Sequence, residues 1–219
     1  MRFTYLFICI VVAELIAVSM DSKPLEYLFK PAIMLALGIY FFQQTAKIEE
    51  TKQRNRIFAA IFFSLIGDII LMFPSGFILG LAAFLVAHLC YIYAFMLDNN
   101  GIVFGKKDRL IAAIGVLAYA IIFLSFVLPK VQTVLQIPIA AYGLTILTML
   151  LTALNRWKSV ENTSFQWVFI GAIVFVFSDS LLAINRFVQP VTLANIGIML
   201  AYSAGQFFIV KGVLKGIKN

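Results

Sequence analysis

Long apolar stretches separated by short polar segments dominate the chain. Most of these stretches hold roughly 20 residues, the length that a helix needs to cross a hydrocarbon core about 30 Å thick. They cover residues 3–20, 25–42, 57–73, 77–97, 110–128, 131–154, 165–184 and 192–210. The connections are short enough for helical hairpins. The pattern predicts an all-α fold, a polytopic transmembrane helical bundle of about eight spans, with residues 1–219 as a single integral membrane domain.

The composition agrees with a bilayer environment. Hydrophobic residues make up 63% of the 219 residues and charged residues only 12%, and the mean hydropathy is +1.00. A soluble core cannot absorb this much apolar surface. The net charge of +7 is spread over short loops, so no nucleic-acid partner is predicted. The two cysteines, Cys9 and Cys90, lie in apolar stretches and are interpreted as packing residues.

The loop charges predict the orientation. In an eight-span arrangement, 13 of the Lys and Arg residues fall on one side and 4 on the other, and the positive-inside rule places both termini in the cytoplasm. The second stretch is interrupted by Glu26 and Lys30. Without it the imbalance would be as strong with the N-terminus outside, so the charges do not choose between seven and eight spans. Every span from Ile57 onward keeps its orientation in both cases.

Two carboxylates, Asp68 and Asp179, lie inside predicted spans at matched depths, toward the outer side. A charged side chain within a bilayer costs a few kcal/mol, on the order of 3 on insertion scales, and such residues mark functional sites. Each aspartate follows a small residue, Gly67 or Ser178, and the two spans are four apart in the chain. A parallel duplication of a four-span unit would bring them face to face.

Further polar residues lie within or beside the spans and can share one cavity that opens toward the outer side. They are Glu14, His88, Asn185, Arg186 and Gln206. Structural roles are also open: Glu14 can pair with Lys30, His88 and Tyr91 can join helices by hydrogen bonds, and Arg186 can extend to the interface. His88 is the only histidine, which argues against a zinc site with several imidazoles. We predict no metal and no cofactor, although carboxylates alone can bind a metal.

Four segments resemble the YhhN-like lysoplasmalogenase family of integral membrane hydrolases. They are Ser64 to Met72 with Asp68, Phe77 to Tyr91 with His88, Gly171 to Phe187 with Asp179, and the last span with Tyr202 and Gln206. Lys30-Pro31 also looks like the Lys-Pro of the family. The resemblance favours eight spans.

This resemblance implies hydrolysis of the vinyl ether bond of lysoplasmalogens to a fatty aldehyde and a glycerophospho-alcohol. Protonation of the β-carbon gives an oxocarbenium ion, water adds, and the hemiacetal collapses. Such chemistry needs a proton donor and a nearby anion, and Asp68 and Asp179 form the predicted catalytic pair, with the acid unassigned. The predicted supporting or substrate-binding residues are Glu14, Lys30, His88, Tyr91, Asn185, Arg186, Tyr202 and Gln206. Lys30 or Arg186 is expected to attract the phosphate head group.

Other functions stay open on the sequence. The intramembrane carboxylates also suit a proton-coupled or small-solute transporter, although the prolines lie mostly near span ends rather than at the mid-span breaks usual in transporters. A structural or assembly subunit is the third reading. The expected partners are a lysophospholipid and membrane lipid, with a homo-oligomer left open. The short loops favour a bacterial inner membrane, and the head-group preference is undetermined.

Overall fold

The computed structural model describes residues 2–48, 51–98 and 107–217, and these residues form eight α-helices. The helices are α1 (Arg2–Ser19), α2 (Lys23–Thr45), α3 (Lys52–Leu71), α4 (Phe77–Met96), α5 (Lys107–Val127), α6 (Thr133–Asn155), α7 (Asn162–Ala183) and α8 (Ala194–Ile217). The short elements are η1 (Pro74–Gly76), η2 (Leu128–Lys130) and the π-helical η3 (Ile184–Val188), which continues α7. The predicted all-α polytopic bundle of about eight spans is confirmed. Lys106 and Lys218, two residues in the charge count, lie outside the described residues.

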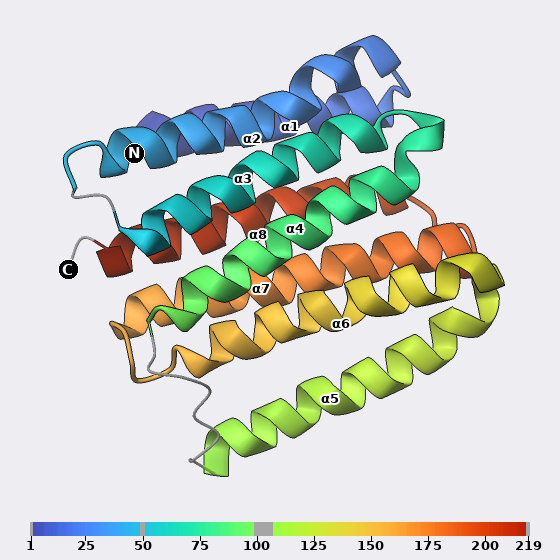
Figure 1. Cartoon of the computed structure of the whole chain (residues 1–219). Helices are drawn as coiled ribbons and strands as arrows, with labels where there is room; N and C mark the ends of the chain where they lie inside the picture. Colours follow the sequence, from blue (N-terminus) through green and yellow to red (C-terminus); the bar gives the residue numbers. More distant parts are fainter. Residues whose placement is uncertain (1, 49–50, 99–106, 218–219) are drawn as a thin grey trace.

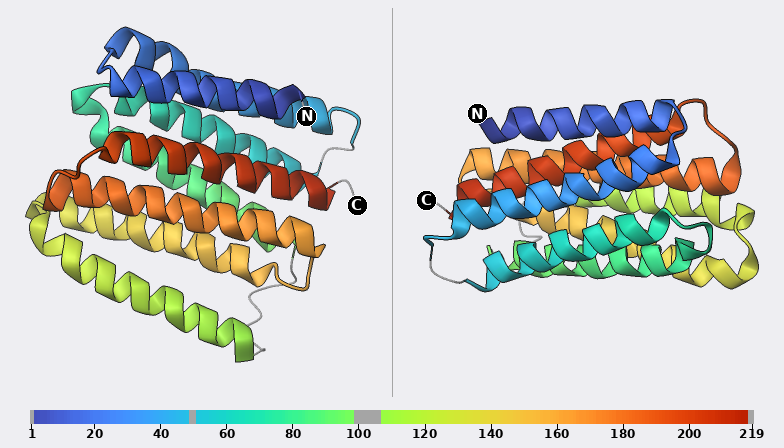
Figure 2. Two further views of the ribbon diagram at one scale, coloured as in Figure 1. Left: turned by 180° about the vertical axis from the view of Figure 1, so that it is seen from behind. Right: turned by 90° about the horizontal axis from the view of Figure 1, so that it is seen from above.

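The helices run side by side along the length of the bundle (Figure 1). Helices α3, α4, α7 and α8 lie in the middle, α1 and α2 along one edge, and α6 followed by α5 along the other. The most extensive contacts join α7 to α8 and α3 to α4. Both views of Figure 2 place the N- and C-termini at the same end of the bundle, as an even number of crossings requires. That this end is cytoplasmic remains a prediction from the loop charges.

Six helices are long and apolar enough to cross a membrane: α2, α4, α5, α6, α7 and α8, some with their flanking short helices. The apolar part of α1, Phe3–Ser19, is slightly short. Helix α3 carries Arg54, Arg56 and Asp68, which exceed the charge expected of a simple span. Both helices nonetheless run alongside the others. Helices satisfy their own backbone hydrogen bonds, so they can continue past the apolar stretches, as α3 does at its start and α8 at its end.

A close backbone approach joins α7 to α8. A Cβ atom built on Gly171 would lie 2.8 Å from the backbone nitrogen of Ile209 and 2.9 Å from the carbonyl oxygen of Gly205. Neither backbone atom can move away without displacing its helix. Small residues are common where membrane helices pack this closely, and here they fix the spacing of the two helices that carry Asp179 and Tyr202.

Replacing Gly171 with alanine should therefore destabilise the protein. Overpacking of this kind costs about 1–3 kcal/mol, which for a chain of this size corresponds to a fall of roughly 5 °C in the unfolding temperature. Thermal unfolding in detergent measures it. Gly115→Ala is the matched control, because nothing lies within 4 Å of a Cβ at Gly115 on α5. An equal effect of the two substitutions would contradict the close approach.

A buried arginine ties four helices together at the end that holds the termini. Arg156 is fully buried. Its Nε donates to Oδ2 of Asp98 at 2.6 Å and its Nη2 to Oγ of Ser164 at 3.0 Å, and the Ser164 hydroxyl donates to the carbonyl oxygen of Gly212. Arg156 lies in the connection after α6, as the charge count has it, but folding encloses it between α4, α6, α7 and α8.

Candidate active site

The two aspartates, on α3 and α7, line one small cavity of about 50 Å³, called here the inner cavity. Asp68 is 2% exposed and Asp179 is half-buried. Lys30 of α2, Tyr142 of α6 and Tyr202 of α8 also line this cavity. Ser178 and seven apolar residues complete it: Leu71, Phe77, Leu81, Phe84, Leu182, Ile198 and Met199. Two carboxyl groups and one ammonium group are therefore enclosed in a mainly apolar wall.

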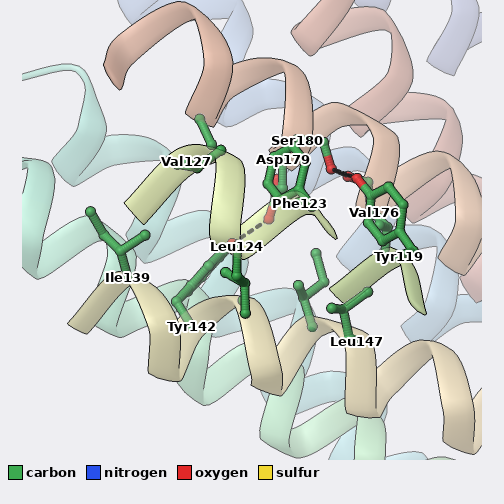
Figure 3. A pocket seen from close by; sticks show the side chains of 13 residues that line it. Tyr119, Phe123, Leu124, Val127, Ile139, Tyr142, Leu147, Val176, Asp179 and Ser180 are labelled. Carbon is green, nitrogen blue, oxygen red and sulfur yellow. Dashed lines mark hydrogen bonds between the residues drawn. The ribbon is translucent and has the colours of Figure 1, made fainter. Parts of the chain in front are cut away.

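Each aspartate accepts a hydrogen bond from a buried tyrosine. The Tyr202 hydroxyl donates to Oδ2 of Asp68 at 2.6 Å, and the Tyr142 hydroxyl donates to Oδ2 of Asp179. Figure 3 shows the second bond from α6 to α7. Such bonds orient each carboxyl group. Tyr142 was not among the predicted site residues, because a tyrosine in an apolar helix gives no sign of a partner on another helix.

The positive charge of Lys30 attracts the carboxyl groups of Asp68 and Glu14. Glu14 is 1% exposed in α1, and its two carboxylate oxygens have no hydrogen-bond partner among the described residues. Glu14 is not part of the inner cavity wall. The structure therefore places Glu14 near the site, in the environment of Lys30, but not at the two aspartates.

A polar cavity of about 220 Å³, called here the outer cavity, adjoins the inner one. Lys30, Asn185, Arg186 and Asn195 give it its polar character. The two cavities share Lys30 and the apolar residues Leu71, Phe77, Leu182 and Ile198. Arg186 is exposed, and its guanidinium lies 3.8 Å from the centre of the Phe77 ring. The outer cavity lies where α7 passes into η3, at the end of the bundle opposite the termini (Figure 1).

Asn185 has a structural contact in addition to its position in the outer cavity. Its Oδ1 accepts a hydrogen bond of 2.9 Å from the backbone N–H of Val191. This bond closes the segment between η3 and α8. Asn195, at the start of α8, was not among the predicted site residues, and only the folded arrangement brings it to Arg186.

Tyr91 and Gln206 form a buried polar cluster with Ser64. The Tyr91 hydroxyl donates to Oε1 of Gln206 at 2.5 Å, and Nε2 of Gln206 donates to Oγ of Ser64 at 3.0 Å. None of the three lines the inner or the outer cavity. They join α3, α4 and α8, so the structure gives them a bracing position rather than a place beside the aspartates.

His88 is fully buried between two rings. Its ring centre lies 5.2 Å from that of Tyr142 and 5.0 Å from that of Phe175. Neither ring nitrogen has a hydrogen-bond partner among the described residues. His88 therefore touches the tyrosine that holds Asp179, but it does not line either cavity. Within the described part of the chain, no group of three or more His, Cys, Asp and Glu side chains could hold a metal ion.

The fold and the cavities define a multi-pass membrane protein with a carboxylate-lined site inside the helical bundle. The chain belongs to the YhhN family, whose model matches residues 25–213. No solved structure matches it significantly.

Several relatives are named lysoplasmalogenases. Lysoplasmalogenase TMEM86B of Homo sapiens is 34% identical over 157 residues, which cover 71% of this chain and 62% of the relative. The lysoplasmalogenase of Mycobacterium bovis is 26% identical over 193 residues, which cover 86% of this chain and 72% of the relative. Lysoplasmalogenase TMEM86A of Homo sapiens is 29% identical over 71% of this chain and 63% of the relative. The chain thus spans less than two thirds of the length of the human relatives. These names give no support to the transporter alternative.

Proposed function

We propose that this protein is a lysoplasmalogenase, which hydrolyses the vinyl ether bond of a lysoplasmalogen to a fatty aldehyde and a glycerophospho-alcohol. The observation that carries the proposal is the pair Asp68 and Asp179, which line one cavity in the membrane domain. The family and the names of the relatives point to the same reaction. A bacterial inner membrane is the proposed location, favoured by the short loops and by the mycobacterial relative.

The reaction needs a proton at carbon and a stabilised cation. One carboxylic acid gives its proton to the β-carbon of the vinyl ether, and the double-bond electrons form the new C–H bond. The adjacent carbon becomes part of an oxocarbenium ion, which the second, ionised carboxylate stabilises. Water adds to that carbon and loses a proton to the first carboxylate, which regenerates the acid. The hemiacetal then breaks its C–O bond to release aldehyde and alcohol.

The charges around the pair support one assignment of the two roles. Lys30 lines the inner cavity together with Asp68, and we take Asp68, the aspartate that its ammonium group attracts, as the ionised member. Two adjacent carboxylates in an apolar site do not both ionise readily. Asp179 is then the proton donor, oriented by Tyr142, while Tyr202 orients the Asp68 carboxylate.

The remaining site residues support this pair. His88 packs on Tyr142, and its unpartnered nitrogens suit it to hold water or assist proton transfer. Tyr91 and Gln206 brace α4 against α8, which steadies Tyr202. Glu14 balances the charge of Lys30.

The outer cavity suits the head group. Lys30 and Arg186 supply positive charge for a phosphate, and Asn185 and Asn195 add amide groups. Because the outer cavity shares Lys30 with the inner one, a phosphate there would leave the adjoining glycerol ether close to the aspartates.

Product analysis of the purified protein tests the proposal. With a 1-alkenyl lysophospholipid the protein should release a fatty aldehyde, and with the matched 1-acyl lysophospholipid it should release no fatty acid. Release of fatty acid from the acyl lipid, or no aldehyde from the alkenyl lipid, would overturn the assignment.

Arg186→Gln tests the head-group site. The substitution removes a charge from the outer cavity but leaves the aspartates and Lys30 in place. We expect KM for a lysoplasmalogen to rise about tenfold, with kcat within about twofold, because a charge-assisted contact made before and during the reaction is lost. Steady-state aldehyde release measures both constants. Lys130→Met is the control, since Lys130 is absent from both cavities, and an unchanged KM in Arg186→Gln would contradict the site.

A further inference from the structure

A third, apolar cavity lies between α5, α6 and α7 (Figure 3), and we call it the chain cavity. Its volume is about 50 Å³. Leu124 of α5, Ile146 of α6 and Val176 of α7 are typical of its wall. Its polar groups are the Asp179 carboxyl, the Ser180 hydroxyl and two tyrosine hydroxyls, of Tyr119 and Tyr142. Apart from these, the cavity offers only hydrocarbon contacts.

The three cavities form a series that passes from polar to apolar. The outer and inner cavities share Lys30, and the inner and chain cavities share Tyr142 and Asp179. A lysoplasmalogen has the same order of groups, with a charged head, an ether next to the glycerol and a hydrocarbon chain. The outer cavity and the chain cavity have no lining residue in common, so an occupant that reaches both through the inner cavity passes Asp179.

We infer that the chain cavity binds the part of the alkenyl chain next to the vinyl ether. This inference rests on the proposed function and adds the orientation of the lipid within the helical bundle. The cavity is too small for a whole chain, so the remainder leaves it at the edge of the bundle, between α5 and α7. The Tyr119 hydroxyl and Ser180 Oγ, 2.5 Å apart, join α5 to α7 at this edge.

A larger apolar groove is the wrong place for the chain. It lies between α2 and α3, has a volume of about 500 Å³ and includes Phe42, Ile61 and Phe62. It shares no lining residue with the inner cavity. A chain held there would not lead to the aspartates.

The chain cavity also agrees with the assigned roles of the aspartates. The carbon that accepts the proton lies on the chain side of the vinyl ether, and the cationic carbon lies on the oxygen side. Asp179 lines the chain cavity, whereas Asp68 lines only the inner one. The proton donor Asp179 therefore lies on the side of the carbon that is protonated, and the anion Asp68 lies on the side of the cationic carbon.

Leu124→Trp fills the chain cavity from α5, and Ile121→Trp is the matched control. Ile121 is on the same helix, is 70% exposed and is absent from the cavity wall. We measure kcat/KM for a hexadecenyl and a three-carbon propenyl lysophospholipid. The indole ring would displace the first methylene groups of the hexadecenyl chain, which the propenyl chain lacks. Leu124→Trp should therefore lower the hexadecenyl-to-propenyl ratio of kcat/KM about tenfold. Ile121→Trp should leave it within about twofold. Equal ratios in the two variants would overturn the inference.

A labelling experiment separates this inference from the proposed function and from misfolding of Leu124→Trp. The probe is a saturated 1-O-alkyl lysophosphatidylcholine with a diazirine on the fourth chain carbon, which the protein need not cleave. In the wild-type protein we expect the label on α5, α6 and α7 at the chain cavity. Label in the α2–α3 groove instead would overturn the chain site even if aldehyde is released. Label in the chain cavity without aldehyde release would support the chain site and refute the hydrolase.

Discussion

Replacing Asp179 with asparagine is expected to lower the rate of aldehyde release about a thousandfold. The substitution keeps the size of the side chain and its ability to accept the Tyr142 hydrogen bond, but it removes the acidic proton. General acid catalysis contributes about 10²–10⁴ in rate, and protonation at carbon is the step that depends on it. Binding of a saturated 1-O-alkyl lysophospholipid should change by less than about threefold, because that ligand needs no proton.

Asp21→Asn is the control for this prediction. Asp21 is a highly exposed acid between α1 and α2, and asparagine tolerates its positive φ of 49°. Activity of Asp21→Asn should be close to that of the wild-type protein. If Asp179→Asn retained more than about a tenth of wild-type activity while folded, Asp179 would not be the acid.

Replacing Asp68 with asparagine should abolish hydrolysis to a similar extent, for a different reason. In our account Asp68 supplies the negative charge that stabilises the oxocarbenium ion, and asparagine cannot supply it. The loss should therefore extend to ligands that imitate this cation. We expect the wild-type protein to bind a lysophospholipid analogue with a protonated amine at the cationic carbon about a hundredfold more tightly than the neutral ether.

The binding preference distinguishes the two aspartates. Asp68→Asn should lose most of the preference for the amine analogue, and Asp179→Asn should keep it, because the proposed mechanism has the Asp179 carboxyl group neutral before the proton transfer. Calorimetry or a thermal-shift titration with both ligands measures the ratio. Loss of the preference in Asp179→Asn alone would reverse the assigned roles.

Much of the fold could be predicted from the length of the apolar stretches. A bilayer leaves a long apolar segment few options besides a helix, so all eight helices lie close to the predicted ranges. The helix ends were less predictable. Helix α3 begins at Lys52 and α8 continues to Ile217, because polar turns outside the hydrocarbon remain helical. The burial of Arg156 was not predictable, since its partners Asp98 and Ser164 come from other parts of the chain.

The candidate site was predictable where a residue is unusual for a membrane span. Asp68 and Asp179 are costly inside a bilayer, so they indicate a site without any structure. Tyr142 is not unusual, and only its hydrogen bond to Asp179 distinguishes it. One regularity was available, since Tyr91 follows Asp68 at the same distance along the chain as Tyr202 follows Asp179. This equal spacing does not predict the hydrogen-bond partners, because Tyr202 donates to Asp68 whereas Tyr91 donates to Gln206.

The order of the cavities could not be derived from the sequence. It depends on which side chains from α2, α5, α6, α7 and α8 meet, and hydropathy does not distinguish one apolar helix face from another. The polar residues of the outer cavity come from α2, from the start of α8 and from η3. Their convergence follows from the packing of α7 on α8 and of α3 on α4.

The most direct test of the central claim is the reaction of the purified protein with a 1-alkenyl lysophospholipid in D₂O. An acid that protonates the β-carbon must deliver a deuteron, so the account predicts a fatty aldehyde with a single deuterium on the carbon next to the carbonyl group. Mass spectrometry measures the deuterium content of the trapped aldehyde, and the Asp179→Asn protein serves as the blank. Aldehyde without deuterium at that carbon, or no aldehyde above the blank, would contradict carboxyl acid catalysis by this site.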